Sequence, residues 1–269
     1  MPELPEVEVT RRGIAPHLTG RVISAVAVRD PRLRWPVPRD VLALAGRTVK
    51  SVERRGKYLV VDCGGGHLIL HLGMSGSLRV LPRDTPVGKH DHFDLVLGDR
   101  VLRLRDPRRF GAVLWTDGNV AEHPLLAHLG IEPLSPALNG DRLYAMTRAH
   151  RAAIKHFLMD GRRIVGVGNI YASEALFRAG ISPRKAARRL TRAECAKLAK
   201  AIKVTLEAAI RAGGSTLQNF VAADGAAGEY QVNTLVYDRG GQKCRRCRSL
   251  IRRFVQGQRS TYYCPTCQR

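Results

Sequence analysis

A chain of 269 residues, 44% of them hydrophobic, is long enough to bury one large core or two ordinary ones. Its 45 Lys and Arg against 23 Asp and Glu give a net charge of +22, which favours a polyanionic partner, and the arginine clusters favour nucleic acid over an anionic membrane. No apolar run is long enough to span a bilayer, and the opening residues lack the features of a secretory signal, so we expect a globular protein of the cytoplasm.

The first eight residues, MPELPEVE, combine a helix start with a candidate nucleophile. Pro5 suits the first turn of a helix, and the glutamates suit the positive end of its dipole. Neither argument explains Pro2. A small residue after Met1 generally permits removal of that methionine, which would leave Pro2 with a free secondary amine. Such an amine titrates near pH 8, at about 7.7–8.0, and its unprotonated form can attack an aldehyde-like carbon to give an iminium ion.

Residues 20–117 are rich in β-branched residues with partial period-two alternation. The candidate strands lie in RVISAVAV, RTVKSVERRGKYLVVD, HLILHLGMSGSLRVL, HDHFDLVLGDRVLRLR and GAVLWT, and turn residues separate them. Short strands at this spacing predict an antiparallel sandwich or barrel.

The pattern changes at GIEPLSPALNG, where we place a domain boundary between residues 132 and 133. Helical spacing follows in residues 142–159, 168–180 and 191–214, and Thr191 with Glu194 predicts a capping box for the last of these. The Gly-rich and Ala-rich segment 213–233 predicts a mobile loop. We therefore expect three parts, 1–132, 133–235 and 236–269.

Four of the six cysteines form two C-x-x-C pairs separated by sixteen residues, namely Cys244, Cys247, Cys264 and Cys267. This spacing predicts one structural tetrahedral Zn²⁺ site, held by a hairpin with its turn near VQGQRS. Disulfides are the alternative, and the absence of a secretory signal disfavours them. Cys63 and Cys195 stand alone, and we expect them to be buried without a chemical role.

GVGNIYASEALF is the strongest motif without cysteine in the second half of the chain. A Gly-x-Gly turn that leads into Asn169 at a helix start exposes backbone N–H groups and a side-chain amide to an anion such as a DNA phosphate. The alternative is an ordinary helix pair with an asparagine cap. Arg259, just past the zinc hairpin's turn, is a second candidate phosphate contact, although an arginine there is often only solvated.

Several residues of the first half are candidates for contact with nucleic acid. Lys57 enters a predicted strand, where it would face water, bind phosphate or donate a proton. His90 and His92 alternate on a strand as metal ligands do, but no third ligand is evident and phosphate contact fits better. Met74 and the run Arg108–Phe110 border turns, where such residues are usually core. They would also suit a wedge that fills the space left by an extruded base.

Taken together, these motifs resemble the bacterial formamidopyrimidine-DNA glycosylase family from end to end. The segments that carry the resemblance appear in order as MPELPEVE, PRLRWPV, RRGKYL, HLGMSGSLR, KHDH, DPRRFG, GVGNIYASEALF and GQRSTYYCPTCQ. Leu4 resembles the branch that acts on oxidised purines, whereas the sister endonuclease branch tends to have Gly there. The resemblance implies an α+β fold: a β-sandwich with an opening helix, a helical domain with a helix–two-turn–helix motif and a lesion-capping loop, and a zinc-finger hairpin.

The resemblance also implies roles for individual residues. Pro2 would attack C1′ of the damaged nucleotide, and Glu3 would assist by proton transfer. Lys57 would donate a proton and bind phosphate, and Arg259 would act in the later elimination and hold the phosphate beside the lesion. The implied DNA contacts are His90, Arg108, Arg151, Lys155 and Asn169, with Met74, Arg108 and Phe110 as the inserted wedge. The implied partner is double-stranded DNA with an oxidised base, bound by a monomer in the bacterial cytoplasm and nucleoid.

The chain departs from the family pattern at three places. The segment DGAAGEYQVN replaces the commoner DGKPGYF pattern in the capping loop, Asp238 stands where glycine is usual, and Arg151 replaces a frequent lysine. A basic residue at 151 preserves attraction to phosphate.

The leading hypothesis is a bifunctional glycosylase and abasic-site lyase for oxidised purines. The alternatives are the same chemistry on oxidised pyrimidines and a zinc-containing protein that binds damaged DNA without turnover. A ribosome-associated RNA-binding protein also fits the charge and the zinc. It leaves Pro2, Glu3 and the wedge unexplained.

Overall fold

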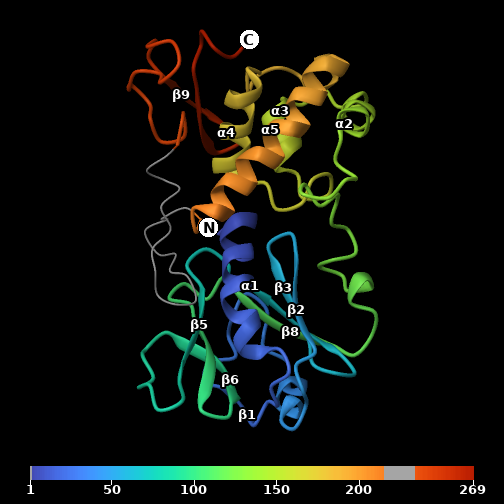
Figure 1. Cartoon of the computed structure of the whole chain (residues 1–269), viewed down its shortest axis with the longest axis vertical. Helices are drawn as coiled ribbons and strands as arrows, with labels where there is room; N and C mark the ends of the chain where they lie inside the picture. The colour runs from blue at the N-terminus through green and yellow to red at the C-terminus, as the bar shows by residue number, and fades with distance from the viewer. Residues whose placement is uncertain (1, 215–233) are drawn as a thin grey trace. The chain divides into compact units, whose positions relative to one another are not determined.

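The computed structural model describes residues 2–214 and 234–269, and these form two compact units. The first unit holds residues 2–128 and 212–214, and the second holds 129–211 and 234–269. Figure 1 labels many of the helices and strands of each unit. No helix in the described ranges has the length and apolar character needed to cross a membrane.

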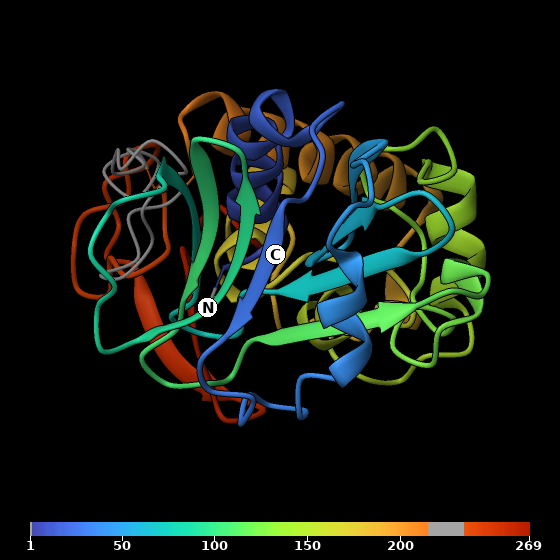
Figure 2. The same ribbon diagram turned by 90° about the horizontal axis from the view of Figure 1, so that it is seen from below.

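The first unit is an antiparallel β-sandwich preceded by a helix, as the sequence predicted (Figures 1 and 2). One sheet has the strand order β1-β6-β7-β5 and the other β2-β3-β4-β8. The bounds are β1 Ala25–Val28, β2 Ser51–Arg55, β3 Tyr58–Asp62, β4 His67–His71, β5 Ser77–Pro82, β6 Asp91–Leu97, β7 Arg100–Arg105 and β8 Ala112–Thr116. The described part of the unit also contains two 3-10 helices, η1 Arg39–Leu44 and η2 Val120–Glu122.

Helix α1, Leu4–Leu18, closes the core of the sandwich. Val7, Ile14 and Leu18 lie on one helical face, because residues seven and eleven positions apart project the same way, and all three are buried. They join one core with residues from both sheets, among them Leu59, Leu70, Phe93, Leu104 and Val113. The helix also contacts β2, β3 and β5, so its N-terminal residues are carried by a rigid support.

The second unit contains the helices and the zinc-finger hairpin. Its elements are α2 Gly140–Thr147, α3 Ile154–Met159, α4 Asn169–Ala179, η3 Ala187–Arg189, α5 Arg192–Arg211, β9 Arg252–Gln256 and β10 Arg259–Tyr263. Helix α5 packs against α2 and α4. The predicted capping box is confirmed, because the Thr191 N–H donates to Glu194 at 2.9 Å and the Glu194 N–H donates to the Thr191 hydroxyl at 3.1 Å.

The helical spacing predicted over residues 142–159 is interrupted in the structure. Helix α2 ends at Thr147 and α3 begins at Ile154, and the residues between them pair with a neighbouring segment. Ala153 bridges Ala186, and the carbonyl of Ala152 accepts the N–H of Ala187 at 2.9 Å. These tertiary hydrogen bonds replace the ones that a continuous helix would make.

The hairpin turn predicted near VQGQRS is confirmed. Gly257 and Gln258 connect β9 to β10 with φ values of 56° and 61°, and Gln256 pairs with Arg259 across the turn. Two residues in the left-handed region are what a tight hairpin of this twist requires. Arg259 is therefore fixed as the first residue of β10.

Candidate functional site

Pro2 and Glu3 lie at the start of α1. Both residues are buried, and Glu3 is only 3% exposed. The backbone N–H of Glu3 donates to the Glu6 carboxylate at 2.7 Å, and the Glu3 side chain accepts from the backbone of Glu6 in return. This capping box fixes the backbone of Glu3, and the residue that would carry the reactive amine is attached directly to it.

Lys57 lies in the two-residue turn between β2 and β3, beside Gly56. Arg54 connects this turn to α1, because its guanidinium donates to Glu8 at 3.1 Å and to the carbonyl of Gly56 at 3.1 Å. Burial alone would raise the pKa of Glu8, but hydrogen bonds from Arg11 and Arg12 and the charges of Arg11 and Arg54 lower it to about 2. Glu8 is therefore a permanent carboxylate that ties the Lys57 turn to the helix of Pro2 and Glu3.

His71, at the end of β4, is a neighbour of Lys57 that the sequence did not single out. Its ring lies 4.8 Å from that of Tyr58, centroid to centroid, and its Nδ1 accepts the N–H of Gly73 at 3.0 Å. Burial and then the charges of Lys57 and Arg34 lower the pKa of His71 to about 4. A neutral imidazole therefore stands next to Lys57 at physiological pH, at the start of the loop that carries Met74.

Asp106 joins the two loops that carry the predicted wedge. Its buried carboxylate accepts the Ser75 hydroxyl at 3.0 Å, the N–H of Arg108 at 3.3 Å and the N–H of Gly111 at 2.7 Å. Gly73 makes the second link between the loops, since a Cβ on it would lie 2.3 Å from the carbonyl carbon of Phe110. The structure thus brings together residues that are about 30 positions apart in the chain.

Met74 and Phe110 remain exposed on these fixed loops. Met74 is 38% exposed and Phe110 is 45% exposed. The guanidinium of Arg108 lies over the Phe110 ring, 4.9 Å from its centroid. Arg109 has a φ of 56°, and it donates to Asp30 at 3.0 Å. A strained backbone that displays an apolar tip suits insertion into a partner better than packing in a core.

His90 is linked to the same pair of loops through the backbone. Its carbonyl accepts the N–H of Asp106 at 2.9 Å, and the Nε2 of the neighbouring His92 lies 2.9 Å from the carbonyl of Asp106. The rings of His90 and His92 are 6.4 Å apart. Among the described residues, groups of three or more metal-ligating side chains occur only at the four cysteines, and His90 and His92 are not among them.

In the second unit, Asn169 and Lys155 converge on the zinc-finger hairpin. The Asn169 amide donates to the carbonyl of Ser260 at 3.1 Å. Lys155, only 1% exposed, donates to the same carbonyl at 3.2 Å and to the Thr261 hydroxyl at 2.7 Å. Arg259 immediately precedes Ser260 and is exposed. The Oδ1 of Asn169 is buried without a hydrogen-bond partner, so this cluster retains an unused acceptor beside the first turn of α4.

Glu174, on the same helix as Asn169, was not singled out by the sequence. It is completely buried, and its carboxylate accepts the backbone N–H groups of Leu235, Val236 and Tyr237 at 2.9–3.0 Å. A carboxylate that accepts several backbone N–H groups is a strong anchor. Glu174 therefore holds the start of the zinc module against α4.

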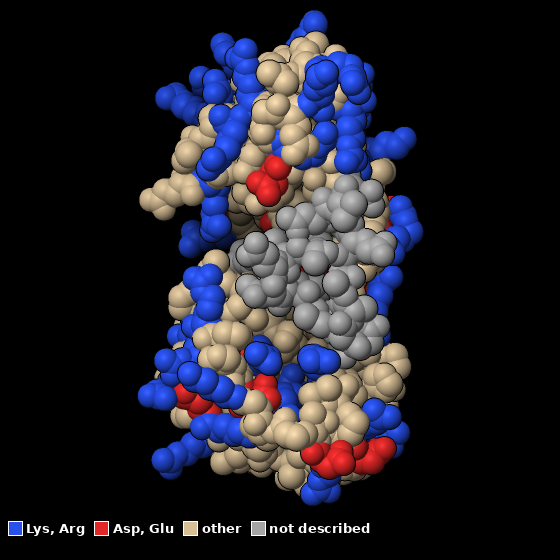
Figure 3. Space-filling model, turned by 90° about the vertical axis from the view of Figure 1, so that its left-hand side faces the viewer, with Lys and Arg blue, Asp and Glu red and all other residues tan. Residues whose placement is uncertain are grey.

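Arg151 is not part of the cluster around Ser260. It is exposed in the segment between α2 and α3, and within the described ranges it has no hydrogen bond or ion pair. The predicted lesion-capping loop and Met1 lie outside the described residues. Figure 3 shows Lys and Arg side chains far more often than Asp and Glu over the face that it draws, in agreement with the net charge.

Cys244, Cys247, Cys264 and Cys267 fit a zinc ion. Their sulfur atoms all lie within 4.8 Å of one another, and a tetrahedral site with Zn–S bonds of about 2.3 Å needs sulfurs about 3.8 Å apart. The N–H groups of Arg246 and Cys267 donate to the sulfurs of Cys244 and Cys264 at 3.4 Å each. Four sulfurs this close can all be thiolates only around a cation. The prediction that these four cysteines form one zinc site is therefore confirmed. Cys63 and Cys195 are buried elsewhere.

The structure explains how Asp238 is accommodated where glycine is usual in the family. Its φ is 58°, a conformation that glycine adopts without strain, which explains why glycine is usual there. Asp and Asn tolerate this region better than other residues. The Tyr262 hydroxyl donates to the Asp238 carboxylate at 3.1 Å and holds the substitute in place.

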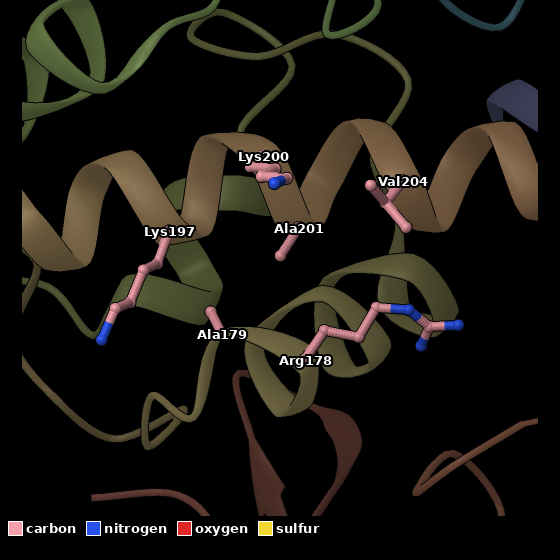
Figure 4. A pocket seen from close by; sticks show the side chains of 6 residues that line it. All are labelled: Arg178, Ala179, Lys197, Lys200, Ala201 and Val204. Carbon is pink, nitrogen blue, oxygen red and sulfur yellow. The ribbon is translucent and has the colours of Figure 1, made fainter.

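A separate hollow of the second unit lies between α4 and α5 (Figure 4). Its lining combines cationic and small apolar side chains, namely Arg178, Ala179, Lys197, Lys200, Ala201 and Val204. It lies at the C-terminal end of α4, ten residues or about 15 Å along the helix from Asn169. None of the predicted site residues lines this hollow, so it is not part of the candidate site.

Models of three protein-domain families match most of the chain. Residues 1–113 match the formamidopyrimidine-DNA glycosylase N-terminal domain, residues 129–221 match the H2TH domain of the same enzyme, and residues 241–269 match a zinc finger found in FPG and IleRS. Two full-length relatives named formamidopyrimidine-DNA glycosylase, from Thioalkalivibrio sulfidiphilus and a Janthinobacterium species, are 57% and 56% identical and are aligned over 100% of both chains.

Solved structures of formamidopyrimidine-DNA glycosylases are also similar to this chain. The crystal structure of the MutM (FPG) protein from Thermus thermophilus is 41% identical, with a TM-score of 0.89 over 99% of this chain and 98% of that one. Lactococcus lactis Fpg in complex with an oxidised pyrimidine containing DNA is 32% identical, with a TM-score of 0.90 over 100% of both chains. A MutM complex with carbocyclic 8-oxo-G containing DNA is equally similar, at 32% and 0.90. The chain belongs to the formamidopyrimidine-DNA glycosylase family.

Proposed function

We propose that this protein is a base-excision repair enzyme that removes oxidised purines from double-stranded DNA and then cleaves the strand at the abasic site. The observation that carries the proposal is the attachment of Pro2 to a rigid capped helix that contacts the strands on both sides of Lys57, in a chain of this family. Removal of Met1 gives Pro2 the secondary amine that the chemistry needs.

The first step is displacement of the damaged base. The Pro2 nitrogen forms a bond to C1′ as the C1′–N bond to the base breaks, and the leaving base takes the electron pair and a proton. Glu3 moves a proton during opening of the sugar ring, which leaves an iminium ion between Pro2 and C1′. The buried position of Glu3 beside Pro2 supports this role.

The second step is strand cleavage. The iminium ion acidifies the C2′ hydrogen, so its loss as a proton drives β-elimination of the 3′ phosphate and then δ-elimination of the 5′ phosphate. Lys57 donates a proton and binds phosphate in these steps, and Arg259 acts in the later elimination and holds the phosphate beside the lesion. Water finally hydrolyses the iminium ion and returns Pro2 to its free form. A neutral His71 beside Lys57 adds no positive charge that would repel the iminium ion.

DNA is held by two groups of residues. His90, Arg151, Lys155 and Asn169 bind backbone phosphates, and Met74, Arg108 and Phe110 enter the space vacated by the extruded base. The exposure of Met74 and Phe110 supports the wedge assignment.

Zinc would be held by the four cysteines and would supply structure, because it fixes the hairpin that carries Arg259. We assign the catalytic part to residues 1–132, the helical DNA-binding part with its lesion-capping loop to 133–235 and the zinc finger to 236–269. We assign the protein to the bacterial cytoplasm and nucleoid as a monomer, and the bacterial origin of the relatives supports that location.

The proposal is tested by borohydride trapping on a duplex with one 8-oxoguanine opposite cytosine. Protein shown by mass to lack Met1 should form a covalent adduct with the DNA, and Pro2→Gly should bind the same duplex without forming it. An adduct formed equally well by Pro2→Gly would contradict the nucleophile. A second trapping experiment, on a duplex with an oxidised pyrimidine, tests the alternative substrate class. Binding to both duplexes without an adduct on either would identify a protein that binds damaged DNA without turnover.

A further inference from the structure

The outer face of the β1-β6-β7-β5 sheet carries a network of ion pairs that is neutral as a whole. Asp94, only 2% exposed, accepts from Arg29 at 2.6 Å and from Arg103 at 3.0 Å. Asp91 lies 3.7 Å from the guanidinium of Arg103. Two arginines and two aspartates therefore match one another's charge.

Arg79 and Arg105 lie on the same face outside this network. Arg79 stands directly opposite Arg103 on the neighbouring strand, and Arg105 lies between Ser77 of β5 and Asp91 of β6, although Asp91 forms its ion pair with Arg103. Like charges in directly opposed positions destabilise a sheet unless something compensates them. No carboxylate pairs with Arg79 or Arg105 anywhere in residues 2–214 and 234–269, and the Nε of Arg79 is buried without an acceptor. Two positive charges on this face are thus unmatched.

The two arginines line a common hollow of about 240 Å³. Leu81, Thr85 and Pro86 form part of its wall, and the carbonyls of Thr85 and Pro86 are already engaged by Arg103 at 3.1 Å and 3.0 Å. The single carboxylate in the lining is Asp91, which also accepts the N–H of Gly88 at 2.7 Å. The hollow therefore has fixed walls and an excess of guanidinium donors.

We propose that this hollow is an oxyanion site in which Arg79 and Arg105 bind a phosphoryl group. Planar guanidinium groups are suited to phosphate oxygens, and two of them can bind a single phosphate from two directions. The wall segment at Gly88 and Asp91 contains His90, which we assign to the DNA backbone. The source that the fold favours is therefore a further backbone phosphate of the bound duplex, and free phosphate is the other source of the same chemistry.

Two measurements test the site. In ¹⁵N-labelled protein, the Nε–H resonance of Arg79, assigned with Arg79→Gln, should shift when inorganic phosphate replaces chloride at constant ionic strength. In binding to an undamaged duplex, Arg79→Gln and Arg105→Gln should each reduce the slope of log K against log salt by about one. Arg100→Gln is the matched control, because it removes an exposed arginine from the same strand, about 17 Å from Arg105, and should leave the slope unchanged.

Each combination of results either supports or overturns the proposed oxyanion site. A reduced salt slope supports a DNA phosphate as the ligand, whether or not free phosphate shifts the resonance. A phosphate-dependent shift with an unchanged slope supports the site and assigns it to free phosphate. A change in neither measurement overturns the proposal. Arg105→Gln keeps the slope measurement available if Arg79→Gln does not fold, and borohydride trapping by wild-type protein tests the enzymatic proposal independently.

Discussion

The Ser75 hydroxyl donates a hydrogen bond of 3.0 Å to Oδ1 of the buried Asp106 carboxylate. This bond joins the loop of Met74 to the loop of Arg108 and Phe110. The other carboxylate oxygen accepts the N–H of Gly111 at 2.7 Å, so one side chain fixes both halves of the proposed wedge.

Asp106→Asn should impair base extrusion more than strand cleavage. The amide keeps the shape of the side chain but presents N–H groups to one of its present donors, and losing a hydrogen bond to a charged group costs about 1.5–3 kcal/mol. The single-turnover excision rate on an 8-oxoguanine duplex should fall about ten- to a hundredfold. Cleavage of a duplex with a preformed abasic site should fall less, because no paired base has to be displaced. Ser75→Ala, which removes one bond only, should show a smaller loss, and equal losses on both substrates for Asp106→Asn would contradict a role in extrusion.

Sequence patterns were sufficient where the cause is local. Period-two alternation located the strands of the sandwich, the pair Thr191 and Glu194 located a helix start, and cysteine spacing located the zinc site. Each of these signals acts between residues that are near in the chain or follow one repeating geometry, so it can be seen without the fold.

Long-range hydrogen bonds could not be predicted in the same way. Asp106 resembles an ordinary turn aspartate in the sequence, and Glu174 resembles a helix residue, but both are buried carboxylates that bind backbone N–H groups of other segments. His71 takes its neutral state from burial and from Lys57, which folding brings near. The break between α2 and α3 has the same origin, since it arises from pairing with residues 186–188.

Cys244→Ser should release zinc and weaken DNA binding. Three thiolates hold the ion less well than four, and the hairpin that carries Arg259 depends on the metal for its shape. Zinc content by atomic absorption and duplex affinity by fluorescence anisotropy should fall together. Cys195→Ala removes a buried cysteine of α5 and should change neither. Full duplex affinity in zinc-free protein would refute an anchoring role for the hairpin.

The neutral state of His71 predicts a loss of stability in mild acid. Its pKa falls from about 6.5 to about 4 on folding, so between these values the unfolded chain binds a proton that the folded chain does not. The free energy of unfolding should therefore decrease as pH falls from 6.5 to 4, by at most about 3 kcal/mol from this group, and should be unaffected by it above pH 6.5.

Urea denaturation across that range checks the assignment. His71→Asn retains an oxygen that can accept the Gly73 N–H but cannot titrate, so its stability should vary less with pH than that of the wild type. His128→Asn removes an exposed histidine and serves as the control. Parallel pH profiles for wild type and His71→Asn would show that His71 is not the titrating group.

Glu174→Gln should loosen the zinc module from α4. The carboxylate accepts three backbone N–H groups, whereas an amide offers one accepting oxygen and directs N–H donors at the rest. Leaving buried N–H groups unsatisfied costs about 1–3 kcal/mol each, so the thermal midpoint should drop by several degrees. Hydrogen exchange at Leu235, Val236 and Tyr237 should accelerate. Glu207→Gln, an exposed position on α5, should change neither quantity.

Because Asn169 and the Ser260 carbonyl connect the same helix and hairpin, the duplex affinity of Glu174→Gln should fall together with the exchange protection. Faster exchange at these three amides with unchanged affinity would mean that the Asn169 and Lys155 contacts alone are enough to place Arg259.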